Sequence, residues 1–179
     1  MSGTDRLHVI TGGPGSGKST LLAALAEAGI ATSAEVGRQV IREQLAAGGD
    51  ALPWADERAF AEAMWPRELA AHAAALATGS VTVLDRGAPD VVGFLRVSGL
   101  PVPPHIDAAA RATRYNCRVF LAPFWAAIYT DDAERKQSPA IAAATEGVTR
   151  ATYAEYGYTL VELPRAPVAE RVRFVLDRL

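Results

Sequence analysis

Residues 12–19 read Gly-Gly-Pro-Gly-Ser-Gly-Lys-Ser, which is a complete G-x-x-x-x-G-K-S loop. An apolar run at residues 7–11 precedes this loop, and an alanine- and leucine-rich stretch at residues 20–28 follows it up to Gly29. The order strand, glycine loop, helix is the setting in which this pattern binds phosphates, because the loop N–H groups and a helix N-terminus then converge on the anion. The sequence therefore predicts a nucleoside triphosphate site near the start of the chain.

Residues within this loop are expected to have distinct roles. Lys18 is placed to reach the outer phosphates, and Ser19 is placed to ligate Mg²⁺. The expected nucleotide is ATP, with GTP as the alternative, and the expected metal is Mg²⁺. The residues predicted to bind the nucleotide are consecutive: Gly13, Pro14, Gly15, Ser16, Gly17, Lys18, Ser19 and Thr20.

Half of the 179 residues are apolar, and the formal net charge is only −2. We expect a single domain over residues 1–179, long enough to bury a full core. There is no block of basic residues, so the composition gives no electrostatic case for nucleic-acid binding. The longest apolar stretch, 119–130, contains Pro123 and is too short to span a bilayer. Because Cys117 is the only cysteine and no room is left for a signal peptide before the first strand, a cytoplasmic location is the simplest expectation.

Strand-like apolar runs alternate with helix-like stretches along the whole chain. The expected strands are residues 7–11, 30–34, 81–84, 118–122 and 158–163. The expected helices are residues 20–28, 36–47, 54–77, 90–97, 105–113 and 140–156, with a final one after Pro167. Pro66 lies within the third of these helices, so we expect a kink or a break there. The alternation predicts an α/β fold, a three-layer P-loop NTPase with a five-stranded parallel sheet between helices.

Two residues of opposite charge follow the third expected strand. Ligands bind at the carboxyl ends of parallel strands, so Asp85 lies where a Walker-B carboxylate holds Mg²⁺. Capping of the next helix is the alternative for this aspartate. The next residue is Arg86, at a position where motor ATPases usually have a glutamate that orients water. A guanidinium stays protonated and can instead clamp a phosphate or a substrate, which favours phosphoryl transfer to an acceptor over hydrolysis.

Glu35 ends the second expected strand and would face the acceptor side of the same cleft. Its carboxylate is a candidate to accept the proton of an attacking hydroxyl. Arg38 follows three residues later, so it would lie near Glu35 in the first turn of a helix. The predicted acceptor-binding residues are therefore Glu35, Arg38 and Arg86. A helix-start acid favoured by the helix dipole is the alternative role for Glu35.

A charged segment, residues 131–137, interrupts the apolar pattern after the fourth expected strand. Arg135 and Lys136 in this segment suit a basic lid, near residues 126–139, that closes on the phosphates. A solvated loop is the alternative, because acidic residues are interspersed with the basic ones. The predicted catalytic residues are Lys18, Glu35, Asp85, Arg86 and Arg135.

Taken together, these motifs resemble those of the predicted AAA-type P-loop ATPases or kinases that are grouped with nicotinamide-riboside-kinase-like and TRPL-translocation-defect-like proteins. The stretches that carry the resemblance are residues 11–19, 35–38, 85–87, 131–137 and 163–165. The resemblance implies a fold like that of nucleoside and nucleotide kinases, with Glu35 as the acid and an adenine pocket lined by residues 163–167. Such kinases space several arginines along the lid, whereas the two basic lid residues are adjacent here.

Two functions are compatible with these features. The first is a small-molecule kinase that transfers the γ-phosphoryl group of ATP to a hydroxyl or phosphate of a nucleoside-like or nucleotide-like substrate. The second is a switch protein that binds ATP or GTP, hydrolyses it slowly and contacts a protein or lipid partner. A fast ATPase motor is disfavoured, because no glutamate follows Asp85. The expected partners are a nucleoside triphosphate and a small-molecule acceptor, without nucleic acid.

Overall fold

A five-stranded parallel sheet forms the centre of the computed structural model, which describes residues 3–128 and 139–179, apart from the side chains of 139–143. Its strands are β1 (Leu7–Thr11), β2 (Ala31–Thr32), β3 (Thr82–Asp85), β4 (Arg118–Leu121) and β5 (Thr159–Glu162). They lie in the order β2-β3-β1-β4-β5, and every neighbouring pair is parallel. The predicted α/β fold with a five-stranded parallel sheet is confirmed.

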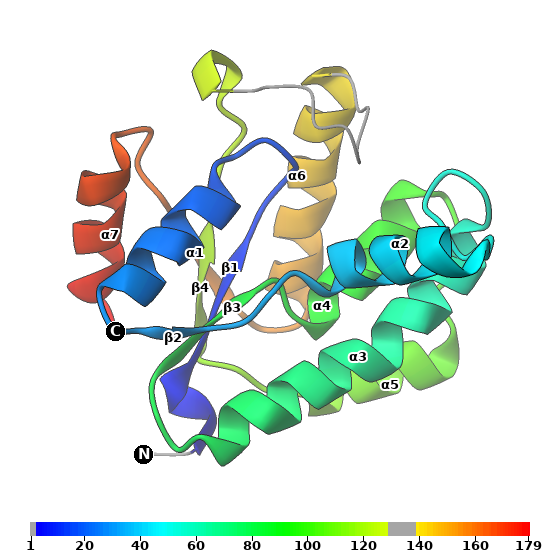
Figure 1. Ribbon diagram of the computed structural model, residues 1–179, viewed down its shortest axis with the longest axis horizontal. Coiled ribbons are helices and arrows are strands. Elements are labelled where there is room, and N and C mark those ends of the chain that lie inside the picture. Colours follow the sequence, from blue (N-terminus) through cyan, green and yellow to red (C-terminus); the bar gives the residue numbers. More distant parts are fainter. Residues whose placement is uncertain (1–2, 129–138) are drawn as a thin grey trace.

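Helices cover both faces of the sheet (Figure 1). The α-helices are α1 (Lys18–Glu27), α2 (Val36–Ala47), α3 (Glu57–Ala77), α4 (Ala88–Val97), α5 (Pro104–Ala112), α6 (Pro139–Glu155) and α7 (Val168–Leu176), and the 3₁₀ helices are η1 (Gly3–Arg6) and η2 (Ala126–Ile128). One core cluster packs α1 and α7 against the sheet through residues that include Leu21, Leu25 and Val175. A second, larger cluster joins the sheet to α2, α3, α4, α5 and α6. Nowhere in residues 3–128 and 139–179 is a helix both long and apolar enough to cross a membrane.

The register of the three central strands brings their carboxyl ends to one edge of the sheet. Ile10 of β1 lies opposite Asp85 of β3 on one side and opposite Phe120 of β4 on the other. All five residues of β1 are buried, as expected for the central strand of a parallel sheet covered on both faces. The loop that leaves β1 therefore starts beside Asp85, where the predicted site residues were expected to meet.

The second strand is shorter than the predicted residues 30–34. Among the described strands it pairs with β3 alone, through Ala31 opposite Thr82 and Thr32 opposite Val83. An edge strand has a partner on one side alone, so nothing keeps the chain extended once it turns toward α2. The local sequence is apolar enough for a strand, but the pairing partner sets its length.

The third helix also differs from its prediction at two points. It begins at Glu57 because the Asp56 side chain accepts a hydrogen bond from the Ala59 N–H at 2.8 Å and caps the helix. It continues through Pro66 as one helix, so of the expected kink or break the break does not occur, and a kink stays a prediction. Pro66 is exposed while its neighbour Trp65 is buried, and packing of the buried side therefore outweighs the loss of one backbone hydrogen bond.

Candidate functional site

The loop between β1 and α1 approaches its neighbours through residues without side chains. Gly12 has a φ of +135°, and a Cβ at this position would lie 2.2 Å from the Ala122 carbonyl oxygen at the end of β4. Gly15 and Gly17 also have positive φ values, of 70° and 75°. Glycine adopts such angles at little cost, so this backbone can follow the curved path that points N–H groups toward an anion.

Lys18 begins α1 and turns its ammonium group back over the loop. Its Nζ donates to the carbonyl oxygens of Gly12 at 2.9 Å and of Gly13 at 2.8 Å, and to Ser16 Oγ at 3.3 Å. Ser16 Oγ itself donates to the Gly13 carbonyl oxygen at 2.8 Å. Ser19, in contrast, is exposed in the first turn of α1. The predicted phosphate-binding residues therefore span the loop and the first turn of α1, with the buried ammonium group of Lys18 over the loop.

Asp85 ends β3 next to this loop and is 5% exposed. Its backbone N–H donates to Ser33 Oγ at 3.0 Å, which fixes the end of the strand. In the part of the chain that the structure describes, Oδ1 of its carboxylate has no hydrogen-bond partner. Burial raises the pKa of the Asp85 carboxyl, while Lys18 acts to lower it and Glu35 acts to raise it.

The residues around Asp85 fit a magnesium ion. A buried carboxylate oxygen without a partner is costly unless a ligand completes it. Mg²⁺ prefers oxygen ligands and usually binds through one or two protein groups together with substrate phosphates. Asp85 and Ser19 provide such oxygens, and the described residues contain no cluster of three or more His, Cys, Asp or Glu side chains that would form an all-protein metal cage. The donor set therefore suits a metal shared between the protein and a nucleotide.

Arg86 connects the acceptor side of the site to the phosphate loop. Its Nε donates to Glu35 Oε1 at 3.0 Å, and its Nη1 donates to the Gly12 carbonyl oxygen at 3.1 Å and to Asp90 Oδ1 at 3.4 Å. Burial acts to lower the pKa of Arg86, but the surrounding carboxylates outweigh it and the pKa is raised. From the sequence we predicted that this guanidinium binds a phosphate or a substrate. In the structure it donates hydrogen bonds to three protein groups, Glu35, the Gly12 carbonyl oxygen and Asp90.

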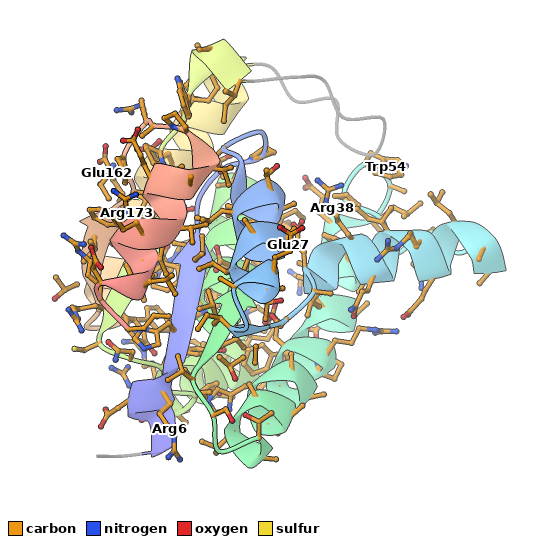
Figure 2. The ribbon with its side chains drawn as sticks, turned by 60° about the vertical axis from the view of Figure 1, so that its left-hand side comes forward. Arg6, Glu27, Arg38, Trp54, Glu162 and Arg173 are labelled. Carbon is orange, nitrogen blue, oxygen red and sulfur yellow. The ribbon has the colours of Figure 1, made fainter. Side chains whose placement is uncertain are left out.

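Glu35 lies immediately before α2 and is held by two arginines. Its Oε2 accepts from Arg38 Nε at 2.9 Å, while its Oε1 accepts from Arg86 Nε. Glu35 is buried, whereas the Arg38 side chain is 32% exposed and lies near the start of α2 in Figure 2. The three predicted acceptor-side residues therefore form one chain of contacts, which runs from the surface at Arg38 to the phosphate loop.

Sequence reasoning missed Asp90, which connects the site from the first turn of α4. Its Oδ1 accepts from Thr11 Oγ1 at 2.5 Å. Its Oδ2 accepts from Tyr153 Oη at 2.5 Å and from the Gly87 N–H at 2.9 Å. With Arg86, four donors thus share this carboxylate: one from β1, one from α6, and two from the turn between β3 and α4. The available signal was its spacing, because an acid four residues after Arg86 in a helical turn can reach that arginine.

A second carboxyl that the sequence did not indicate, Glu68, lies beneath the site in the middle of α3. It is almost fully buried, and burial raises its pKa to about 8, with Asp90 acting in the same direction and Arg86 in the opposite one. Glu68 therefore carries its proton in the folded protein at neutral pH. No sequence pattern distinguishes it from Glu62, an exposed glutamate of the same helix.

The predicted lid cannot be compared with the fold, because Arg135 and Lys136 lie outside the described residues. On either side of that segment, η2 ends at Ile128 and α6 begins at Pro139. Glu146 of α6 accepts a hydrogen bond from the Phe124 N–H at 2.6 Å, which ties the turn after β4 to α6. A lid near residues 126–139 stays a prediction.

A family assignment agrees with this geometry. The sequence pattern of the AAA_28 family, described as an AAA domain, matches residues 7–171. The chain belongs to this AAA domain family. No curated protein sequence matches the chain.

Solved structures share the fold of this AAA domain at low sequence identity. The NadR protein, solved in complex with NR, has a TM-score of 0.72 and 18% identity over 97% of this chain and 50% of that chain. Deoxyadenosine kinase from M. mycoides has a TM-score of 0.66 and 15% identity over 96% of this chain and 97% of that chain. Shikimate kinase from Acinetobacter baumannii, in complex with shikimate, has a TM-score of 0.57 and 16% identity over 96% of this chain and 90% of that chain. The AAA domain thus spans about half of the NadR chain, and these likenesses confirm the kinase-like P-loop fold.

Proposed function

We propose that this AAA domain is a small-molecule kinase that transfers the γ-phosphoryl group of ATP to a hydroxyl or phosphate of a nucleoside-like or nucleotide-like acceptor. The observation that carries the proposal is the Arg86 guanidinium, which contacts both Glu35 and the Gly12 carbonyl oxygen. One side chain thus joins an acceptor-side acid to the phosphate loop. A hydrolase needs a group that orients water, and the residue after Asp85 is this arginine. The shared fold with deoxyadenosine kinase and shikimate kinase supports the same class of reaction.

The transfer needs charge neutralisation and positioning more than covalent chemistry. A bond forms between the acceptor oxygen and the γ-phosphorus, while the bond from that phosphorus to the bridging oxygen breaks and ADP leaves. Lys18 and the loop N–H groups are placed to neutralise charge on the phosphate oxygens. Mg²⁺, which Asp85 and Ser19 would hold, supplies further neutralisation of that charge when bound.

Glu35 is assigned to the acceptor hydroxyl. Its two oxygens each accept a hydrogen bond from an arginine, which fixes the orientation of the carboxylate. A fixed carboxylate can hydrogen-bond the attacking hydroxyl and accept its proton as the new bond forms. Arg38, the most exposed member of this group, is placed to bind a charged part of the acceptor.

The direct test is a screen for acceptors. Purified protein is incubated with Mg-ATP or Mg-GTP and a panel of nucleosides, nucleotides, vitamin ribosides and shikimate, and released nucleoside diphosphate is measured. We expect release that depends on one class of acceptor. Slow release that no acceptor accelerates would contradict the kinase proposal and favour the nucleotide switch.

Two substitutions separate binding from transfer. Lys18→Ala is expected to abolish transfer, because it removes the ammonium group at the centre of the phosphate loop. Glu35→Gln is expected to lower kcat by about 10²–10⁴-fold while leaving the dissociation constant of ATP nearly unchanged. Steady-state kinetics and nucleotide titrations measure the two quantities. Equal losses in both would show that Glu35 has a structural role only.

A further inference from the structure

Arg171 of α7 is a buried cation that lies against the phosphate loop. It is 4% exposed, and its Nη1 donates to the Ser16 carbonyl oxygen at 3.2 Å. The same nitrogen would lie 2.7 Å from a Cβ at Gly17, so the guanidinium is directly beside the residue that precedes α1. Figure 1 shows α7 next to α1, on the same side of the sheet. A helix near the end of the chain therefore contacts the loop near its start.

The residues that the structure describes compensate this cation poorly. In residues 3–128 and 139–179, Nε of Arg171 has no hydrogen-bond partner, and its side chain donates to one acceptor, the Ser16 carbonyl oxygen. Burial lowers the pKa of Arg171, and within the described part of the chain no carboxylate opposes that shift. The first turn of α1 contains no acidic residue, although a helix N-terminus already carries about half a positive charge. Two positive groups thus meet at the start of α1.

A purely structural contact would not require a charge here. A glutamine amide could donate to the Ser16 carbonyl oxygen without the cost of desolvating a guanidinium. A buried cation is favourable when an anion arrives to pair with it, since charge-assisted interactions strengthen in a water-poor environment. The anion that a loop of this kind directs to the start of α1 is a polyphosphate.

We propose that Arg171 is a positioning residue that couples the docking of α7 to the binding of nucleotide phosphates. Through the Ser16 carbonyl oxygen it holds the loop in its curved form, and the charge of a bound polyphosphate compensates its own. The inference rests on nucleotide binding, which is one part of the proposed function, and it does not depend on phosphoryl transfer.

The test compares variants that separate charge from hydrogen bonding. Arg171→Gln retains a donor for the Ser16 carbonyl oxygen and removes the charge, while Arg171→Lys retains the charge. Arg173→Gln is the matched control, because Arg173 is exposed on the same helix (Figure 2). For each protein, the dissociation constant of Mg-ATP is measured by calorimetry at several salt concentrations, and Tm is measured without nucleotide.

Arg171→Gln is expected to weaken Mg-ATP binding by about tenfold, the effect of losing one charge-assisted contact. Its dissociation constant should also depend less steeply on salt than that of the unchanged chain. The Tm of the nucleotide-free protein should be unchanged or higher, because an uncompensated buried charge has been removed. Arg171→Lys should retain most of the affinity, and Arg173→Gln should alter neither quantity.

The opposite pattern would overturn the inference. A lower Tm for Arg171→Gln with the Mg-ATP affinity and its salt dependence unchanged would show that Arg171 only holds the fold together. If Arg171→Gln does not fold, Arg171→Lys decides the question. An Arg171→Lys protein with a lower Tm and an unchanged affinity for Mg-ATP would also show that Arg171 only holds the fold together. Failure of the unchanged chain to bind Mg-ATP would contradict both proposals, whereas binding without acceptor-dependent transfer would contradict the kinase proposal alone.

Discussion

At the scale of single residues, charged side chains near the phosphate loop are connected to one another by hydrogen bonds. Arg86 is its centre, since it contacts Glu35, Asp90 and the Gly12 carbonyl oxygen. It is also the one non-glycine residue with a positive φ, of 74°, in the described part of the chain. That conformation costs about 1–2 kcal/mol for a residue with a Cβ. The contacts of the guanidinium offset this cost, so the strained backbone and the charged group depend on each other.

Substitution of Asp90 tests this dependence. Asp90→Asn replaces one of the two carboxylate oxygens, which accept hydrogen bonds, by an NH₂ group, which donates them. Depending on which oxygen is replaced, the NH₂ group faces the hydroxyl of Thr11 or that of Tyr153. We expect the free energy of unfolding to fall by about 1–3 kcal/mol, because at least one buried donor loses its partner. We also expect kcat to fall, since Arg86 loses one of its anchors. Urea unfolding and acceptor-dependent kinetics measure the two effects, with Asp177→Asn at the exposed end of α7 as the control. An unfolding free energy equal to that of the control would contradict the central place given to Asp90.

At the scale of elements, the phosphate loop depends on how closely β1 and β4 lie at the edge of the sheet. Gly12 and Gly29 both have positive φ, but their surroundings differ. A Cβ at Gly12 would lie 2.2 Å from the Ala122 carbonyl oxygen, whereas a Cβ at Gly29 would meet no atom within 4 Å. The two positions therefore separate backbone strain from steric overlap.

Alanine at these two positions should have unequal effects on stability. Gly29→Ala is expected to cost about 1–2 kcal/mol through its backbone angle alone. Gly12→Ala adds an overlap with the backbone of the β4 end, so we expect about 2–5 kcal/mol and weaker nucleotide binding. Chemical unfolding together with a nucleotide titration measures both. Equal costs for the two variants would show that the loop can move away from β4 without penalty.

The boundaries of elements were harder to predict than their existence. Buried stretches such as residues 7–11 and 119–121 are recognisable because a central parallel strand is largely apolar on both faces. β2 could not be delimited, because its length depends on pairing with β3 and local propensity does not encode that partner. α3 passes through Pro66 because tertiary packing of its buried side outweighs a local preference to stop.

At the scale of the whole molecule, burial of ionisable groups makes stability depend on pH. The pKa of Glu68 rises from 4.5 to about 8 in the folded protein. Below pH 4.5 both the folded and the unfolded chain carry this proton, and the group has no effect on stability. As the pH rises from 4.5 to 8, the unfolded chain loses the proton while the folded chain keeps it, so Glu68 lowers the free energy of unfolding. Above that range the penalty is constant.

Glu68→Gln should remove this penalty. We expect the free energy of unfolding of the nucleotide-free variant to exceed that of the unchanged chain near pH 8 by a few kcal/mol. This size follows because each unit by which a pKa differs between the folded and unfolded chain corresponds to about 1.4 kcal/mol. The difference should shrink toward zero as the pH falls to 4.5. Urea unfolding across this pH range measures it, and Glu27→Gln on the exposed side of α1 is the control (Figure 2). A difference that does not vary with pH would show that Glu68 is ionised in the folded state.

The sequence by itself determined the phosphate loop, the alternation of strands and helices along the chain, and the α/β class. Those features are local, because glycine angles, apolar runs and the spacing of Lys18 and Ser19 are properties of neighbouring residues. The sequence also indicated Glu35, Asp85 and Arg86, because parallel strands all end at the same edge of the sheet.

Only the tertiary structure decided which of these groups touch. Asp90 and Tyr153 lie 63 positions apart in the chain, and Arg171 and Ser16 lie 155 positions apart, yet each pair is joined by a hydrogen bond. Helices and strands pack against one another through their buried faces, and this packing brings polar groups together that no sequence spacing relates. Burial then altered the pKa of Glu68 and left the cation of Arg171 without a carboxylate partner in the described residues, because water is excluded only once the layers have assembled.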